Sequence, residues 1–196
     1  MNVEFVIGTY NRPHHLTTLL GSIVTQTVPN WRVHVIADGW FEGLEKVKEY
    51  FSFDNRIRFS IIDGPNKDFG NTPRMYGKEV CVEDWMIMTG DDNYYLPIVV
   101  EEILAVTDSN TNFVCWDTLL NFSNLDWKYR GVLYTKPEPE MIDIGSFATR
   151  PSLARQVKYD TKTHTGDGEF ARDYVNLFCR ELNSYKKIDK ILYVHN

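Results

Sequence analysis

The stretch WMIMTGDDNYYLP, Trp85 to Pro97, joins an apolar run to three consecutive oxygen-bearing side chains. The run from Trp85 to Thr89 is typical of a buried strand, and Asp91, Asp92 and Asn93 follow where that strand would end. Two adjacent carboxylates repel each other, and burying either one unpaired is costly. We therefore expect a positive group at this turn. A hard divalent cation, Mg²⁺ or Mn²⁺, that shares its ligands with a substrate diphosphate fits best.

A purely structural role for the acidic turn is also open. Asp91 and Asp92 could cap a helix that begins near Leu96, or could lie in a solvated turn. Neither alternative requires a ligand, so the decision depends on what the fold brings close to the two carboxylates.

Short apolar runs alternate with segments of helical periodicity through the first two thirds of the chain. Strands are expected at Val3–Ile7, Trp31–Ala37, Arg56–Ile62, Trp85–Thr89 and Phe113–Trp116, and helices at about 16–24, Leu44–Phe51, Asn71–Val82 and Ile98–Val106. This order predicts an α/β fold with a central, mostly parallel sheet flanked by helices. In such sheets ligands bind at the carboxyl ends of the strands. Thr9, Tyr10, Asp38 and the acidic turn are therefore expected at one edge.

The last third of the sequence is less regular. Strands are expected at Gly131–Tyr134, Ile142–Ala148 and Lys187–Val194, and helices at Pro151–Val157 and Gly168–Leu182. Without a convincing linker, the whole chain, 1–196, is expected to form a single domain.

Composition and charge exclude several classes of protein. The 196 residues are 43% hydrophobic and 24% charged, as in ordinary globular domains, and the net charge of −6 argues against nucleic acid as a partner. The three cysteines are widely spaced and show no zinc or disulfide pattern. Apolar runs fall short of the ~18 residues of a membrane span, and a signal peptide is not evident. A cytoplasmic protein is expected, and a longer parent protein is compatible with the sequence.

Several motifs resemble the family 2 glycosyltransferases of the GT-A fold. Residues 6–39, VIGTYNRPHHLTTLLGSIVTQTVPNWRVHVIADG, are similar to that family's opening, and TGDDNYYLP (89–97) resembles its metal-binding acidic motif. MIDIGSFATRPSLARQV (141–157) is similar to the segment that lines the acceptor side. TGDGEFARDYV (165–175) resembles the region of the catalytic base, and LYVHN (192–196) the carboxy-terminal metal-binding histidine. The resemblance covers nearly the whole chain and implies a GT-A fold.

The resemblance implies a role for each residue of the nucleotide site. Asp38 would accept the N3–H of a uracil or thymine ring, and Thr9 and Tyr10 would line the nucleoside pocket. Arg74 and, with weaker support, Arg12 would lie near the nucleotide and its diphosphate. The structural alternatives are a strand-end turn for Asp38, a core position for Tyr10 and a solvated surface position for Arg74.

The same resemblance implies a metal site. Asp92 would bind Mn²⁺ or Mg²⁺ directly, Asp91 would contact the ribose or a metal-bound water, and His195 would be a further ligand. The family's strict motif is Asp-x-Asp, and Gly90 stands where its first aspartate would often be. This departure leaves the division of roles between Asp91 and Asp92 open. The alternative for His195 is a surface position near the chain end.

Asp167 is the implied general base, with Glu169 as its substitute if the alignment slips by two positions. Asp167 lies between two glycines just before an expected helix, so an N-cap is the structural alternative. In an inverting transfer, a single carboxylate takes the proton of the attacking acceptor hydroxyl.

The sequence thus predicts a metal-dependent glycosyltransferase that moves a sugar, with inversion, from a UDP- or dTDP-linked donor to an acceptor hydroxyl. Residues 1–95 would bind the nucleotide and 96–196 the acceptor. One alternative is a sugar-nucleotide nucleotidyltransferase, although GTYNRP is a poor triphosphate loop. The other is a nucleotide-sugar or glycan-binding module without turnover.

Overall fold

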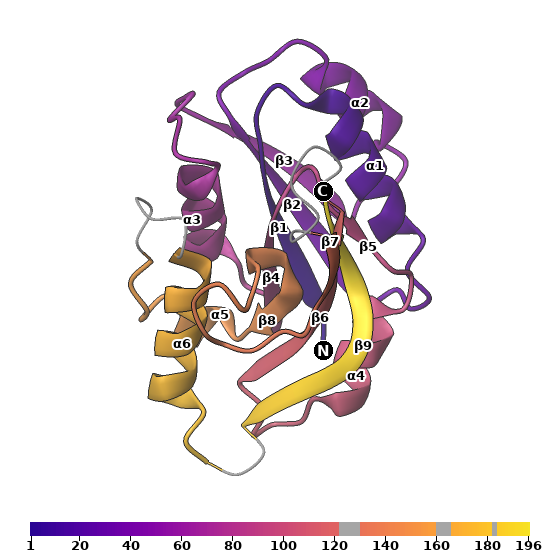
Figure 1. Cartoon of the computed structure of the whole chain (residues 1–196). Helices are drawn as coiled ribbons and strands as arrows, with labels where there is room; N and C mark the ends of the chain where they lie inside the picture. Colours follow the sequence, from indigo (N-terminus) through magenta and orange to yellow (C-terminus); the bar gives the residue numbers. More distant parts are fainter. Residues whose placement is uncertain (122–129, 160–165, 182–183) are drawn as a thin grey trace.

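A mixed β-sheet forms the centre of the molecule, seen in a computed structural model that describes residues 1–121, 130–159, 166–181 and 184–196 (Figure 1). The strand order is β3-β2-β1-β4-β8-β6-β9-β5, with β7 paired to β6. The strands are β1 (Val3–Thr9), β2 (Trp31–Asp38), β3 (Ile57–Ile62), β4 (Trp85–Gly90), β5 (Tyr94–Tyr95), β6 (Phe113–Asn121), β7 (Arg130–Leu133), β8 (Phe147–Thr149) and β9 (Tyr185–His195). The helices are α1 (Pro13–Val24), α2 (Leu44–Tyr50), α3 (Asn71–Val80), α4 (Val99–Val106), α5 (Pro151–Ala154) and α6 (Gly166–Phe178), with a 3-10 turn η2 (Ile144–Ser146).

The first four strands are parallel to one another. β1 pairs with β2 on one side and with β4 on the other, so that Val3 aligns with both Trp31 and Trp85. Every residue of β1 is buried. The carboxyl ends of these strands therefore meet at one edge of the sheet, as the alternation of the sequence predicts.

The second half of the sheet is mixed. β8 is antiparallel to both β4 and β6, β9 runs parallel to β6, and the short β5 is antiparallel to the end of β9. The α/β fold with a central, mostly parallel but mixed sheet is confirmed. Each of these antiparallel pairs includes β7, β8 or β9, which belong to the third of the sequence in which periodicity is weak.

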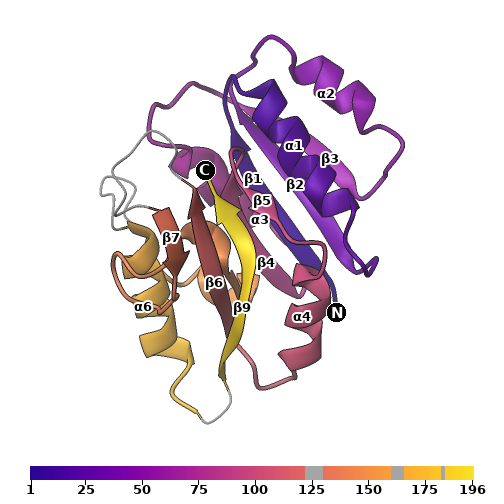
Figure 2. The same cartoon turned by 45° about the vertical axis from the view of Figure 1, so that its right-hand side comes forward.

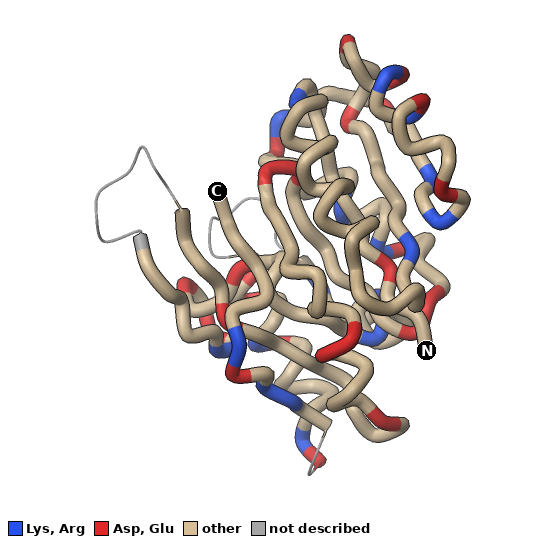
Figure 3. Tube along the Cα trace, turned by 90° about the vertical axis from the view of Figure 1, so that its right-hand side faces the viewer, with Lys and Arg blue, Asp and Glu red and all other residues tan. Residues whose placement is uncertain are grey.

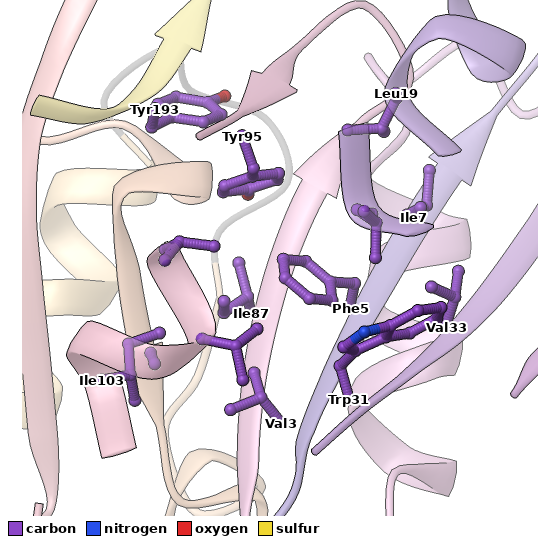
Figure 4. Packing of buried hydrophobic residues seen from close by; sticks show 14 of the residues in the cluster. Val3, Phe5, Ile7, Leu19, Trp31, Val33, Ile87, Tyr95, Ile103 and Tyr193 are labelled. Carbon is purple, nitrogen blue, oxygen red and sulfur yellow. The ribbon is translucent and has the colours of Figure 1, made fainter. Parts of the chain in front are cut away.

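Helices cover both faces of the sheet (Figures 1 and 2). α1, α2 and α4 cover one face, where Phe5, Trp31 and Ile87 belong to a continuous apolar core that includes the rings of Tyr95 and Tyr193 (Figure 4). α3, α5 and α6 cover the other face, over a second core rich in aromatic rings. Leu16, Leu19, Leu20 and Ile23 recur at helical spacing and bury one side of α1.

The structure corrects several expected boundaries. The predicted strand Ile142–Ala148 is wrong over its first half, because Asp143 accepts a hydrogen bond from the Gly145 N–H (2.9 Å) and forms a capping box that starts η2. The strand of this segment, β8, is confined to Phe147–Thr149. The predicted helix Gly168–Leu182 begins two residues earlier and ends at Phe178. Leu182 lies outside the described residues, as do 122–129 and 160–165.

Charged residues of both signs are interspersed along the described trace (Figure 3). Within the described residues, none of the helices is both long and apolar enough to cross a bilayer.

Candidate active site

A cavity of about 590 Å³ lies at the carboxyl ends of β1, β2 and β4. Its lining includes nine of the ten residues that the sequence suggested for a site, namely Thr9, Tyr10, Arg12, Asp38, Arg74, Asp91, Asp92, Asp167 and His195. The tenth, Glu169, is not among the residues that line the cavity. The fold therefore brings together side chains that are up to 186 positions apart in the sequence, from Thr9 to His195 (195 − 9).

The acidic turn is held by groups from the first strand and the loop that follows it. The Thr9 hydroxyl donates to Asp91 Oδ2 (2.6 Å), and the Arg12 guanidinium donates to Asp92 Oδ2 (2.5 Å) and lies 3.5 Å from Asp91 Oδ1. Burial raises the pKa of Asp91, although Thr9 and Arg12 oppose the shift. The expected positive group at the turn is thus partly supplied by Arg12.

The capping alternative for the acidic turn is wrong. α4 begins at Val99, its N-cap is Ile98, and this helix end has no side-chain cap. Asp91 is nearly fully buried in the cavity wall, so it does not lie in a solvated turn either.

His195 forms an ion pair with Asp143, a cavity residue that the sequence did not single out. His195 Nδ1 lies 2.8 Å from Asp143 Oδ2, while the Tyr193 hydroxyl donates to Asp143 Oδ1 (2.8 Å). Burial alone would raise the pKa of Asp143, but the charge and hydrogen bond of His195 outweigh it and lower that pKa. The pKa of His195 is raised because Asp143 outweighs the effect of burial. The alternative of a surface tail is therefore wrong for His195.

The donor set around the acidic turn suits a hard divalent cation. The Asn93 side-chain oxygen is buried and has no hydrogen-bond partner among the described residues, although it lies in the same cavity as Asp92 and His195. Carboxylate and amide oxygens with an imidazole are ligands that Mn²⁺ accepts. Asp143 holds the second nitrogen of His195, as carboxylates commonly do for metal-binding histidines. Among the described residues, however, no three His, Cys, Asp or Glu side chains form a complete site. A bound substrate would have to supply further ligands.

Asp167 lies in the first turn of α6 and faces the cavity. The Tyr159 hydroxyl donates to Asp167 Oδ1, and the Ile144 N–H donates to Oδ2 (3.3 Å). Burial raises the pKa of Asp167, and the nearby Asp143 adds to the shift. Because the helix begins at Gly166, Asp167 is not the N-cap, and that alternative is wrong. The next residue is glycine because a Cβ on Gly168 would lie 2.5 Å from the main chain of Pro139.

Asp38 ends β2 and is almost completely buried at the cavity wall. Both of its carboxylate oxygens accept hydrogen bonds from Asn66, in the turn after β3. Tyr10 is 45% exposed, so it is not a core residue, and its ring meets Phe41 edge to face at 6.5 Å. Both the Asp38 carboxylate and the accessible ring of Tyr10 line the cavity.

Arg74 is buried in the first turns of α3, so the alternative of surface solvation is wrong. Its guanidinium donates to Phe69 O (3.0 Å) and to Asn71 Oδ1 (2.6 Å), while its Nε has no hydrogen-bond partner among the described residues. A Cβ on Gly8 would lie 3.0 Å from Gly70 O, so the small residue at the end of β1 lets this segment approach closely.

Comparisons with known proteins agree with this geometry. The family model described as "Glycosyl transferase family 2" matches residues 4–171. The chain belongs to this family. An uncharacterized glycosyltransferase of Haemophilus influenzae is 26% identical over 156 residues, which cover 79% of this chain but only 46% of the relative. The chain thus spans about half the length of that curated relative.

Solved structures show the same fold. Staphylococcus aureus TarS 1–349 matches with a TM-score of 0.76 and 18% identity, over 100% of this chain and 60% of TarS 1–349. Its complex with UDP matches with a TM-score of 0.73. The mannosyltransferase PcManGT from Pyrobaculum calidifontis, in complex with GDP-Man and Mn²⁺, matches with a TM-score of 0.71 at 12% identity, over 99% of this chain and 56% of PcManGT. The family 2 chain therefore has the GT-A fold that its motifs imply.

Sequence reasoning missed three residues that shape the cavity: Asp143, Tyr159 and Asn66. Asp143 stands inside the segment that resembles the acceptor side, so its carboxylate was a visible signal. Tyr159 acts through one hydrogen bond to Asp167 and Asn66 through two to Asp38, and no periodicity or spacing marks such contacts.

Proposed function

We propose that this family 2 glycosyltransferase moves a sugar from a UDP- or dTDP-linked donor to an acceptor hydroxyl with inversion, and that Mn²⁺ or Mg²⁺ assists. The observation that carries the proposal is that one cavity contains the acidic turn, the Asp38 carboxylate and the buried Asp167. TarS, which shares the fold, has been solved with UDP and with UDP-GlcNAc, and this supports a uridine donor here.

Different residues of the cavity have different roles in the proposed reaction. Asp38 and Tyr10 bind the base and nucleoside, and the acidic turn lies where the diphosphate would bind. Asp167 takes the proton of the acceptor hydroxyl as that oxygen attacks the anomeric carbon and the bond to the diphosphate breaks. A carboxylate with a raised pKa is a better proton acceptor near neutral pH than an ordinary aspartate, provided that it is still ionised.

A bound divalent cation would neutralise the charge that develops on the departing diphosphate. Asp92 and His195, with the Asn93 oxygen nearby, are the residues that would hold it. Arg12 and Arg74 also line the cavity and would offset part of the charge of a bound diphosphate.

The nucleotidyltransferase alternative and the binding module gain no specific observation. Asp167 has no evident task in a protein that only binds. A transfer assay with Asp167→Asn therefore separates an enzyme, which loses turnover but retains nucleotide binding, from a module that has no turnover to lose.

Thermal unfolding with UDP, dTDP, GDP, CDP and ADP, each with and without Mn²⁺, tests the donor proposal. Ligand at 100 times its Kd adds about 2.7 kcal/mol, which raises Tm by roughly 5 to 10 °C for a domain of this size. We expect a rise with uridine or thymidine diphosphate plus Mn²⁺, and its loss in Asp92→Ala. If none of the five nucleotides changes Tm, the proposal is wrong.

A further inference from the structure

The Asp38 carboxylate is clamped by a single residue. Asn66 donates its main-chain N–H to Asp38 Oδ2 (3.0 Å) and its side-chain amide to Asp38 Oδ1 (2.6 Å). The same amide also donates to the main-chain oxygen of Asp63 (2.8 Å). All three N–H groups of Asn66 are therefore engaged, and two of them form a fork on one carboxylate.

Two glycines allow this clamp to form. A Cβ on Gly64 would lie 2.4 Å from Asp38 Oδ1, so only glycine leaves room for the carboxylate against the main chain. Gly39, directly after Asp38, has a φ of +86°, and a Cβ there would lie 3.0 Å from Gly64 C. The turns after β2 and β3 thus pack main chain against main chain and enclose Asp38 between them.

The fork changes what Asp38 can recognise. An ionised carboxylate offers about four lone-pair sites, two on each oxygen. The fork of Asn66 uses one on each oxygen, along the edge that two parallel N–H donors would need. One lone-pair site remains on each oxygen, and these two sites do not share the edge that the fork occupies, so two parallel N–H donors of one base could not bind both.

Nucleobases differ in the donors that they would present to such a site. Uracil and thymine carry one ring N–H between two carbonyls. Guanine presents its ring N–H beside an exocyclic amine, two parallel donors that suit an open carboxylate. Cytosine and adenine present a ring nitrogen lone pair beside their amine, and this lone pair would face the negative charge of Asp38.

We infer that Asn66 is a positioning residue that restricts Asp38 to a single N–H and so selects a uracil or thymine nucleotide over a guanine nucleotide. The inference rests on the proposed function, because it assumes that Asp38 contacts the base. A guanine in this site would leave its exocyclic amine unpaired, which buried sites discriminate against strongly.

Calorimetric titration of UDP and GDP, with Mn²⁺ present, into the wild-type chain and Asn66→Ala tests the inference. The substitution removes the amide donor but retains the main-chain N–H to Asp38 Oδ2. We expect UDP to bind about tenfold more weakly, because a charge-assisted hydrogen bond that holds Asp38 is lost. GDP should bind as well as before or better, so the ratio of the two Kd values falls at least about tenfold.

Asp63→Asn is the matched control, since Asn66 contacts only the main-chain oxygen of Asp63. This variant should leave both affinities at wild-type values. If Asn66→Ala unfolds below the assay temperature, Asn66→Ser replaces it, with the same expected fall in the ratio.

The outcomes separate the inference from the proposed function. Equal weakening of UDP and GDP would show that Asn66 is only structural, and the inference would be wrong while the uridine donor stands. A wild-type chain that prefers GDP would overturn the inference and the choice of base, but not the family. Binding of neither nucleotide would overturn the proposed donor site and the inference with it.

Discussion

The parallel and the mixed parts of the sheet bring residues to the cavity in different ways. In the parallel part, Thr9, Asp38 and Asp91 lie at or directly after the ends of β1, β2 and β4. In the mixed part, Asp143 precedes a 3-10 turn and Asp167 lies in the first turn of a helix. The first three positions follow from sheet register alone, whereas the other two do not.

Both parts contain strand ladders, but side-chain hydrogen bonds that span long stretches of chain also fix the turns and helices of the mixed part. Regular ladders align the parallel strands residue by residue. In the mixed part, single side-chain bonds span long stretches of chain: the Tyr95 hydroxyl donates to Gly145 O (3.0 Å) and the Tyr174 hydroxyl to Asn112 O (3.0 Å). The residues proposed for the donor side thus lie at strand ends, whereas Asp143 and Asp167 lie at a 3-10 turn and a helix start that depend on specific side-chain contacts.

The largest expected effect concerns the separation of the proposed donor side from the proposed acceptor side. Asp167→Asn should lower kcat by about 10²- to 10⁴-fold, the usual contribution of a general base, and should leave UDP affinity unchanged. Steady-state kinetics with calorimetry measures both. The control is Asp173→Asn, an exposed carboxylate on the same helix, which should retain activity. A large loss of UDP affinity in Asp167→Asn would contradict the division between the two parts.

The parallel part of the fold could be predicted because its signals are local. A buried strand such as Trp85–Thr89 is one apolar run, and the polar residues that follow it mark the ligand edge. The polar turn at Asp143 could not be predicted, because the apolar residues around it have the spacing of a strand. Its capping box and its bond to Tyr193, 50 positions away, override that pattern.

Nine of the ten residues that the sequence suggests for a site line the cavity, whereas several element boundaries of the last third are displaced. Asp167 and His195 were named through a family resemblance, although the helix boundary at Gly166 and the strand start at Tyr185 were displaced by two residues. Motif residues are fixed by chemistry, whereas element boundaries depend on packing. The partners of Asp38 and Asp167 remained hidden for the same reason, since Asn66 and Tyr159 are chosen by three-dimensional proximity.

The next effect tests how the mixed part is stabilised. Phe113 is fully buried and stacks on Phe147 (5.3 Å) and Tyr185 (5.7 Å). Phe113→Ala should lower the free energy of unfolding by about 3–5 kcal/mol, because it leaves a cavity in the aromatic core. Chemical denaturation measures the loss. Phe113→Leu retains most of the volume and should cost less, and equal losses for both variants would argue that stacking rather than volume decides.

His34 gives a pH-dependent effect in the parallel part. This buried histidine on β2 contacts the Ser60 hydroxyl through Nε2 (2.8 Å) and the ring of Tyr76, and burial, with Arg58 nearby, lowers its pKa to about 4. The unfolded chain takes up a proton near pH 6.5, but the folded chain does so only near pH 4. The contribution of His34 to the free energy of unfolding is therefore fully present above pH 6.5, and it is lost as the pH falls to about 4.

The size of the effect follows from the two pKa values. The loss should reach ~3 kcal/mol across this window. Urea denaturation of wild type and His34→Gln between pH 4 and 7 measures it. Glutamine does not titrate. The difference between the two variants in the slope of unfolding free energy against pH therefore reports His34 alone, because the buried carboxylates are the same in both. Parallel stability curves would show that the pKa of His34 is the same in the folded and the unfolded chain, and would contradict the prediction.

The smallest expected effect concerns a single hydrogen bond on the proposed acceptor side, from Tyr159 to Asp167. The Tyr159 hydroxyl donates to Asp167, and this bond lowers the pKa of a carboxyl that burial raises. In Tyr159→Phe the ring can still pack on Phe170, 5.6 Å away, but the pKa of Asp167 should rise further. The acid limb of kcat should move to higher pH, and kcat at neutral pH should fall about three- to tenfold.

A matched control separates this electrostatic effect from lost packing. Tyr174 lies on the same helix as Asp167 and donates its hydroxyl to the main chain of Asn112, but no hydrogen bond joins it to Asp167. Tyr174→Phe should therefore lower stability without moving the acid limb. If both variants move the limb equally, the hydroxyl of Tyr159 has no special role. The position and pKa of Asp167 would then depend on the packing of α6 as a whole. The acceptor side would in that case be held by packed elements, as the strand-end residues of the parallel part are, and less by single hydrogen bonds.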